Sequence, residues 1–178
     1  MKDPSNWTEA DLQALVDGNV QEDLHLDYKR SAALAKAEPC RLELSKDVSA
    51  FANSDGGLII YGIAEGKDNH PMGIDEGVNA VELNREWLEQ TIVSNIQPKI
   101  DRLAIYPIPL PSKDKNRVAY VVSIPQATSR APHQARDKRY YKRYNSVPME
   151  DYEIRDIYRR AMTPEELLPL SQVAPYVV

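Results

Sequence analysis

The segment at residues 58–63, with the sequence LIIYGI, constrains the fold of this chain most strongly. Its apolar side chains follow one another almost without interruption over the length of one strand. Such a run is typical of a strand in the middle of a sheet, buried on both faces. The preceding SDGG predicts a tight turn, in which Gly56 and Gly57 permit backbone angles that other residues avoid.

Helices and strands alternate along the rest of the chain. Thr8 and Asp11 have the spacing of a capping box at the start of a first helix. Pro107 and Pro109 place their strand at a sheet edge, because proline cannot donate a hydrogen bond to a neighbouring strand. We expect helices at residues 8–18, 39–54, 84–96 and 150–160, and further strands at 24–29, 102–110, 117–125 and 138–144.

These elements predict an α+β domain with a mixed sheet and helices packed on it. In a chain of 178 residues, we expect an N-terminal helix at 1–18, a central domain at 19–160 and a tail or linker at 161–178. Cys40 is the only cysteine, which excludes an internal disulfide and indicates a reducing compartment. Without an apolar signal segment or a run of membrane-spanning length, the sequence predicts a cytoplasmic location.

The charge of the chain is distributed unevenly. The net charge is −5, but residues 1–65 carry about −6 and residues 112–160 about +6. Two interpretations fit this asymmetry: a basic surface for nucleic acid, or two parts of one fold with matching charges.

The pair Asp27 and Lys29 is the first candidate for chemistry. In a strand at 24–29, the two side chains point to the same face because strand side chains alternate. A metal-dependent nuclease would use such a pair, with the carboxylate as a ligand for Mg²⁺ or Mn²⁺ and the lysine as a partner for developing charge. An ordinary solvated strand face is the alternative.

Two more carboxylates belong to the same hypothesis. Glu22 lies five residues before Asp27, and Glu65 follows the buried strand. Carboxylates at the mouth of a central strand often bind ligands, although Glu65 could equally open a polar loop.

A basic segment near the end of the domain is the second candidate site. Its cations can reach phosphates, and its tyrosines can stack on bases. A sheet edge protected by charge is the alternative. The predicted nucleic-acid-binding residues are Arg130, Arg136, Lys138, Arg139, Tyr140, Lys142 and Arg143. We expect binding to depend on Lys142 and Arg143.

Four motifs in order give the chain a family resemblance: EDLHLDYKRS, KDVSAFANSDGGLIIYGIAEG, HPMGID and RAPHQARDKRYYKRYNSV. Together, from Asn19 to Tyr158, they resemble the AlbA_2-type Schlafen domain, which is described as DNA-binding. In animal Schlafen proteins this fold resembles a metal-dependent endonuclease acting on tRNA-like RNA. Two such lobes face each other there across a basic valley, so the resemblance implies that this chain forms a homodimer.

The resemblance also implies an acidic trio of two glutamates and one aspartate. By position, these fall on Glu22, Asp27 and Glu65, so that the second residue is one methylene shorter and the third one methylene longer than in the family pattern. The implied cofactor is Mg²⁺ or Mn²⁺, with Lys29 as the electrostatic partner of the trio.

Three functions therefore stay open from the sequence. The first is a metal-dependent endonuclease on structured RNA such as tRNA, with DNA as a possible substrate. The second is a non-catalytic DNA-binding module of a transcriptional regulator or defence protein. The third is an interaction domain whose basic segment meets an acidic protein.

Overall fold

The computed structural model describes residues 2–127, 131–143 and 146–160. The α-helices are α1 (Glu9–Asp17), α2 (Glu38–Asn53), α3 (Arg85–Asn95) and α4 (Asp151–Arg160). Short 3-10 helices are η1 (Pro4–Asn6), η2 (Ser31–Ala33) and η3 (Lys67–Asn69). The strands are β1 (Leu26–Lys29), β2 (Gly57–Tyr61), β3 (Ile63–Glu65), β4 (Pro71–Ile74), β5 (Val78–Asn79), β6 (Ala104–Pro109), β7 (Arg117–Ile124), β8 (Tyr141–Lys142) and β9 (Val147–Pro148).

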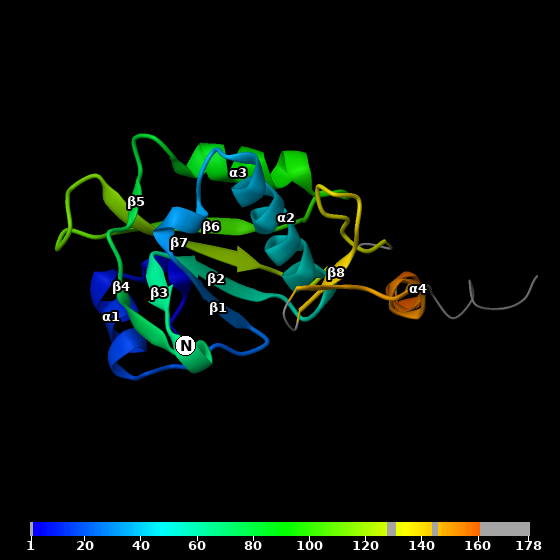
Figure 1. Ribbon diagram of the computed structural model, residues 1–178, viewed down its shortest axis with the longest axis horizontal. Coiled ribbons are helices and arrows are strands. Elements are labelled where there is room, and N and C mark those ends of the chain that lie inside the picture. The colour runs from blue at the N-terminus through cyan, green and yellow to red at the C-terminus, as the bar shows by residue number, and fades with distance from the viewer. Residues whose placement is uncertain (1, 128–130, 144–145, 161–178) are drawn as a thin grey trace, which may run out of the picture.

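Strand β2 lies inside a mixed sheet (Figure 1). It pairs in parallel with β1 and antiparallel with β7. Strand β6 pairs along the other edge of β7, while β5 pairs with the part of β7 that β2 leaves free. The expected α+β class, the internal position of β2 and the edge position of β6 are confirmed.

Apolar layers cover both faces of this sheet. Helices α2 and α3 pack on one face, where Ile59 and Tyr61 of β2 join their core. Helix α1 and the hairpin of β3 and β4 lie toward the other face, where Ile60 enters a second core with Leu12. Thr8 and Asp11 form the expected capping box at the start of α1. The alternation along β2 thus explains the continuous apolar run.

The chain leaves the central sheet at Gly62, which is earlier than the sequence suggested. Gly62 has a φ of 118°, and a Cβ there would lie 3.0 Å from the Cβ of Ala119 on β7. The next residues form β3, which pairs with β4 in a separate hairpin. Glu65 therefore ends a hairpin strand and not the central strand.

The predicted strand at 138–144 is much shorter than expected. Lys138 has a φ of 66°, and its N–H donates to the carbonyl of Ala135 at 3.0 Å, so the chain turns there. Beyond the turn, Tyr140 forms an isolated bridge with Gln134, and Tyr141 and Lys142 form the short strand β8 opposite β9. The expected alternation of two faces along 138–144 is therefore wrong at its start, and Tyr144 lies outside the described residues.

Helix α4 follows β9 and lies beside β8 in Figure 1. The tail expected at 161–178 lies outside the described residues. No helix in the described part of the chain is long and apolar enough to cross a membrane.

Candidate functional site

Strand β1 directs Asp27 and Lys29 toward α2. Its alternate side chains Leu26 and Tyr28 are buried in the core beneath α1. Asp27 and Lys29 therefore point to the opposite face. Lys29 Nζ and Asp27 Oδ2 form an ion pair at a distance of 2.5 Å. The expectation that the two side chains lie together on one face is confirmed.

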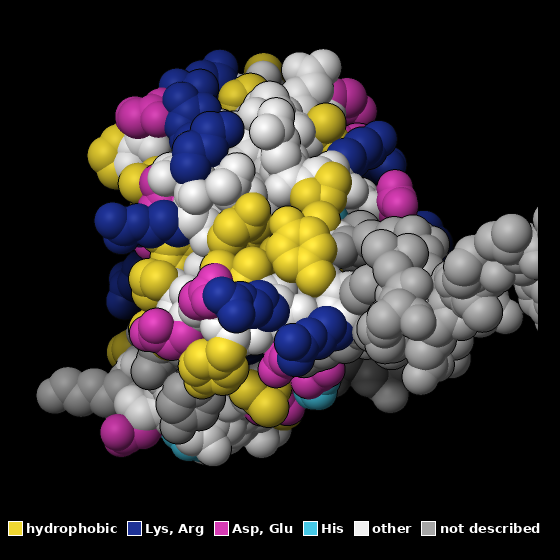
Figure 2. Space-filling view, turned by 90° about the vertical axis from the view of Figure 1, so that its right-hand side faces the viewer, with side chains coloured by type: hydrophobic (Ala, Val, Ile, Leu, Met, Phe, Trp, Pro, Cys, Tyr) yellow, Lys and Arg dark blue, Asp and Glu magenta, His cyan; other side chains and the backbone are white. Residues whose placement is uncertain are grey.

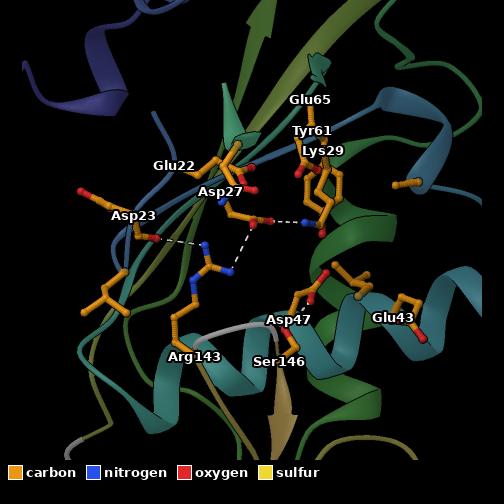
Figure 3. A pocket seen from close by; sticks show the side chains of 14 residues that line it. Glu22, Asp23, Asp27, Lys29, Glu43, Asp47, Tyr61, Glu65, Arg143 and Ser146 are labelled. Atoms are coloured by element: carbon orange, nitrogen blue, oxygen red, sulfur yellow. Dashed lines mark hydrogen bonds and ion pairs between the residues drawn. The ribbon is translucent and has the colours of Figure 1, made fainter. Parts of the chain in front are cut away.

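Asp27 is buried and is held by two cations (Figure 3). Besides Lys29, Arg143 donates from Nη1 to Asp27 Oδ1 at 3.1 Å. Burial opposes the charge of Lys29, but the nearby carboxylates of Asp27 and Asp47 outweigh burial and raise the pKa of Lys29. Asp27 thus has a positive partner at each of its oxygens.

Arg143 connects the basic segment to β1. Its Nη2 atom donates to the carbonyls of Asp23 and Leu26 at 3.0 and 3.1 Å. Its guanidinium carbon lies 4.4 Å from the centre of the Phe51 ring, in a cation–π arrangement. Because its side chain is only 11% exposed, Arg143 acts as an internal cation in this conformation.

Glu22, Asp27 and Glu65 line one cavity of about 830 Å³. Glu22 Oε1 accepts a hydrogen bond from the backbone N–H of Tyr28 at 2.6 Å. Burial, followed by the charges of Asp27 and Glu65, raises the pKa of Glu22 to about 7. The structure therefore brings the three residues of the acidic trio to one cavity, although Glu65 arrives from β3.

Asp47 and Tyr61 also line this cavity, and neither was predicted from the sequence as a site residue. Burial raises the pKa of Asp47, and Ser146 Oγ donates to Asp47 Oδ1 at 2.8 Å. The Tyr61 hydroxyl is buried and has no hydrogen-bond partner in the described structure. The sequence did contain a signal for Asp47. Leu44 and Val48 mark the buried face of α2, and Asp47 lies three residues after Leu44 and directly before Val48, so its carboxylate lies next to that face.

The acidic trio does not fit a divalent metal as it is arranged. Asp27 is occupied by Lys29 and Arg143, and one oxygen of Glu22 by a backbone N–H. No group of three or more His, Cys, Asp or Glu side chains among the described residues is placed to hold a metal ion. Asp27 would have to release a cation before both of its oxygens could bind a metal.

The cavity as a whole is acidic. Among the described residues that line it, the cations are Lys29 and Arg143, both paired with Asp27. Its carboxylates are Glu22, Asp23, Asp27, Glu43, Asp47 and Glu65. Such a lining repels phosphate, so backbone contacts to a nucleic acid would have to be made elsewhere.

The basic segment at residues 136–143 divides into paired and unpaired cations. Lys142 Nζ lies 2.5 Å from Glu153 Oε1 of α4, and Arg143 is paired with Asp27. Lys138 and Arg139 are exposed, and no carboxylate in the described residues forms an ion pair with either. Arg130 lies outside the described residues.

Tyr140 is half-buried. Burial and then the neighbouring Tyr158 hydroxyl raise its pKa. Tyr140 therefore packs partly against α4 and does not project freely into solvent.

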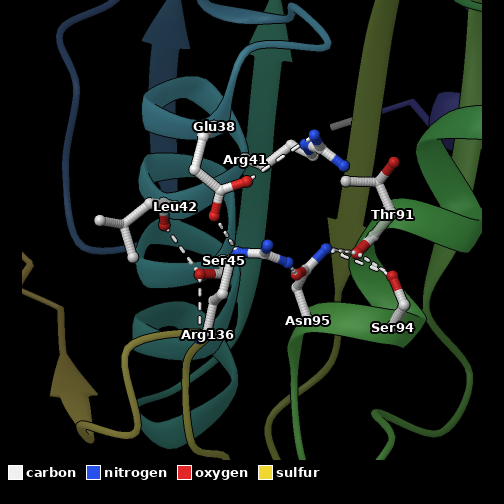
Figure 4. A network of polar contacts seen from close by, with 8 residues as sticks. All are labelled: Glu38, Arg41, Leu42, Ser45, Thr91, Ser94, Asn95 and Arg136. Atoms are coloured by element: carbon white, nitrogen blue, oxygen red, sulfur yellow. Dashed lines mark hydrogen bonds and ion pairs between the residues drawn. The ribbon is translucent and has the colours of Figure 1, made fainter.

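Arg136 has a structural role within a polar network between α2 and α3 (Figure 4). Its Nε is paired with Glu38, and its Nη1 donates to Asn95 Oδ1. Its backbone N–H donates to Ser45 Oγ at 3.2 Å. These contacts fix the guanidinium of Arg136 between α2 and α3.

Figure 2 shows the side of the molecule on which α4 and β8 lie. Basic side chains form several separate groups there, with acidic side chains beside them, around a hydrophobic patch. The described part of this face therefore offers separate basic points and not one continuous basic strip.

Comparisons with known proteins agree with this fold. The family model described as "Schlafen, AlbA_2" matches residues 22–148. The DIP2311 protein from Corynebacterium diphtheriae is similar in structure, with a TM-score of 0.57 at 21% sequence identity. The match covers 86% of this chain but only 31% of that protein. Among curated proteins, none matches the sequence.

The chain belongs to the Schlafen AlbA_2 family, because the family model matches well over half of it. The family assignment made from the sequence is confirmed, as is the AlbA_2-like fold. Membership of this family indicates a nucleic-acid-related domain.

Proposed function

We propose that this chain is a nucleic-acid-binding domain that contacts backbone phosphates through Lys138 and Arg139. The observation that carries this proposal is the exposure of both side chains without a carboxylate partner in the described residues. Cations of this kind contribute most of the affinity for a phosphate backbone, because binding releases counterions. Paired cations such as Lys142 and Arg143 would first have to leave their carboxylates.

The partner that we propose is structured RNA such as tRNA, with DNA as the alternative. The family resemblance supports RNA. Exposed cations such as Lys138 and Arg139 favour backbone contacts, which are common to both nucleic acids. Titration of labelled tRNA, single-stranded DNA and duplex DNA in the presence of a chelator, followed by fluorescence anisotropy, would test the proposal. Micromolar affinity that weakens with salt is expected, and no binding of any of the three would contradict it.

A metal-dependent endonuclease is the second candidate function. The observation in its favour is that Glu22, Asp27 and Glu65 line one cavity beside Lys29. This candidate requires Mg²⁺ or Mn²⁺ and a rearrangement that frees Asp27 from Arg143 or Lys29.

Thermal unfolding with and without Mn²⁺ separates the two candidates. A resident metal stabilises the folded state by mass action, so the endonuclease would melt at a higher temperature with Mn²⁺, and Asp27→Asn would abolish the shift. The binding module should show no Mn²⁺-dependent shift and no cleavage of tRNA. A shift together with Mn²⁺-dependent cleavage that is lost in Asp27→Asn would establish the nuclease.

A further inference from the structure

A second, smaller cavity lies at the C-terminal end of α3 and has a volume of about 270 Å³. We call it the α3 groove; it is lined by Ser94, Asn95, Gln97, Gln134, Ala135, Arg136 and Lys138. A water molecule in the liquid takes up about 30 Å³, so the cavity has the volume of roughly nine water molecules. This volume is enough for a phosphate group and its nearest atoms. In contrast to the acidic cavity, the described residues that line the α3 groove include no carboxylate.

The cations at the α3 groove outnumber the nearby carboxylates. Figure 4 shows the guanidinium groups of Arg41 and Arg136 on two sides of the Glu38 carboxylate, between α2 and α3. Arg41 Nη2 lies 3.7 Å from Glu38 Oε2. Arg136 is paired with the same carboxylate, whereas Lys138 forms no ion pair with a carboxylate among the described residues. The carboxylate of Asp137 accepts a hydrogen bond from the Tyr141 hydroxyl at Oδ2, at 2.6 Å.

The Arg136 guanidinium and the backbone turn at Lys138 are fixed before any ligand arrives. Arg136 is anchored through Nε and Nη1, and its Nη2 has no partner among the described residues. The turn that carries Lys138 is closed by Gln134 Nε2, which donates to the Lys138 carbonyl at 2.8 Å. Pre-positioned donors bind an anion at a lower entropic cost than mobile surface side chains.

We infer that the α3 groove is a phosphate-binding site, in which Arg136 Nη2 and Lys138 Nζ contact the oxygens of one phosphate group. The side-chain amide of Gln97 is exposed at the rim and supplies a neutral donor. This inference rests on the proposed function and assigns one backbone phosphate of the bound nucleic acid to a defined position. It also adds Gln97 and Gln134, which the basic pattern of the sequence did not single out.

Charge reversal at Lys138 tests this site without disturbing the Arg136 network. We expect Lys138→Glu to weaken tRNA and DNA binding roughly tenfold. We also expect the log–log salt slope to become shallower by about 0.7 to 0.9. Ser94→Glu, which places a carboxylate at the same groove, should weaken binding similarly. Lys113→Glu makes the same charge change in the exposed turn between β6 and β7 and should bind within about twofold of the parent.

Inorganic pyrophosphate provides a probe that does not depend on nucleic-acid binding. In the parent it should shift the side-chain amide NMR signals of Gln97 and Gln134, and in Lys138→Glu it should not. If the parent binds nucleic acid and both groove variants bind equally well, the phosphate site and the contact through Lys138 are refuted, while nucleic-acid binding through Arg139 stands. If the parent binds no nucleic acid, the proposed function fails. In that case, amide shifts with pyrophosphate would support the groove as an anion site, and unchanged amides would overturn it.

Discussion

Asn53 shows how one residue joins two distant parts of the chain. Its Nδ2 atom donates to the carbonyls of His133 and Tyr141 at 2.8 and 3.0 Å, and its Oδ1 accepts from the N–H of His133 at 2.6 Å. Asn53 is the last residue of α2, but these bonds do not go to the turn that follows the helix. Asn53 instead holds the basic segment against the end of α2.

Asn53→Ala should therefore destabilise the protein by roughly 2–4 kcal/mol, because buried backbone groups of His133 and Tyr141 lose their partner. Urea unfolding measures this change. Asn116→Ala, in the exposed turn before β7, is the matched control and should change the free energy of unfolding by less than about 0.5 kcal/mol. Equal stability of the two variants would mean that the Asn53 bonds do not anchor the segment.

Glu22 should make stability depend on pH near neutrality. Its pKa is raised from 4.5 to about 7 in the folded protein, first by burial. The folded state thus keeps this proton at a pH where the unfolded state has lost it, so the free energy of unfolding falls as pH rises from about 4.5 to about 7. Glu22→Gln stays neutral, should lack this fall and should be more stable than the parent above pH 7.

Urea unfolding across this pH range checks the Glu22 prediction. The exposed Glu89→Gln variant on α3 serves as control and should follow the pH profile of the parent. A Glu22→Gln profile parallel to that of the parent would show that Glu22 does not titrate near neutrality.

At the scale of elements, the contact between β1 and the basic segment depends on Asp27 and Arg143. Both side chains are nearly buried, at 5% and 11% exposure. A double-mutant cycle with Asp27→Asn and Arg143→Met should give a coupling energy of roughly 1–3 kcal/mol. Met keeps an apolar stem over Phe51 while it removes the charge.

The same cycle on Asp151 and Arg155 of α4 provides the control. This pair is exposed, at 76% and 67%, and should couple by less than about 0.5 kcal/mol. A coupling at Asp27 and Arg143 no larger than at the control pair would indicate that β1 and the basic segment are held together by other contacts.

Local patterns predicted most elements because local physics determines them. The capping box of α1, the apolar run of β2 and the proline-marked edge strand β6 all correspond to short sequence signals. The strand at 138–144 failed because Lys138 turns the chain with a positive φ, which alternation of side chains cannot reveal. Glu65 was predicted at the end of the central strand, because nothing in the sequence marks Gly62 as the residue where the chain leaves the sheet. The close approach of Gly62 to Ala119 on β7 becomes visible only in the structure.

At the scale of the whole molecule, the two candidate sites depend on contacts that no local pattern contains. The sequence brought Asp27 and Lys29 together correctly, since both belong to one strand. It assigned Arg143 to a binding surface, although Arg143 reaches Asp27 across 116 positions of the chain. Asp47 and the α3 groove were missed because tertiary packing of α2, α3 and residues 134–138 creates their surroundings.

We predict that the chain forms a homodimer, because the resemblance to animal Schlafen proteins implies a two-sided basic valley, and one chain supplies a single lobe. Light scattering at high micromolar concentration should give twice the mass of one chain, which is 20.2 kDa. A monomer mass under these conditions would refute this prediction and would leave nucleic-acid binding by the single lobe unaffected.

The salt dependence of tRNA binding tests the central claim most directly. It should be measured by fluorescence anisotropy for the parent, for Lys138→Glu/Arg139→Glu and for the matched control Lys113→Glu/Lys115→Glu. If the unpaired cations carry the binding, the first variant should lose about 10²-fold in affinity, with a slope shallower by about 1.4 to 1.8, while the control stays near the parent. Equal affinities and slopes for all three proteins would contradict the assignment of nucleic-acid binding to Lys138 and Arg139.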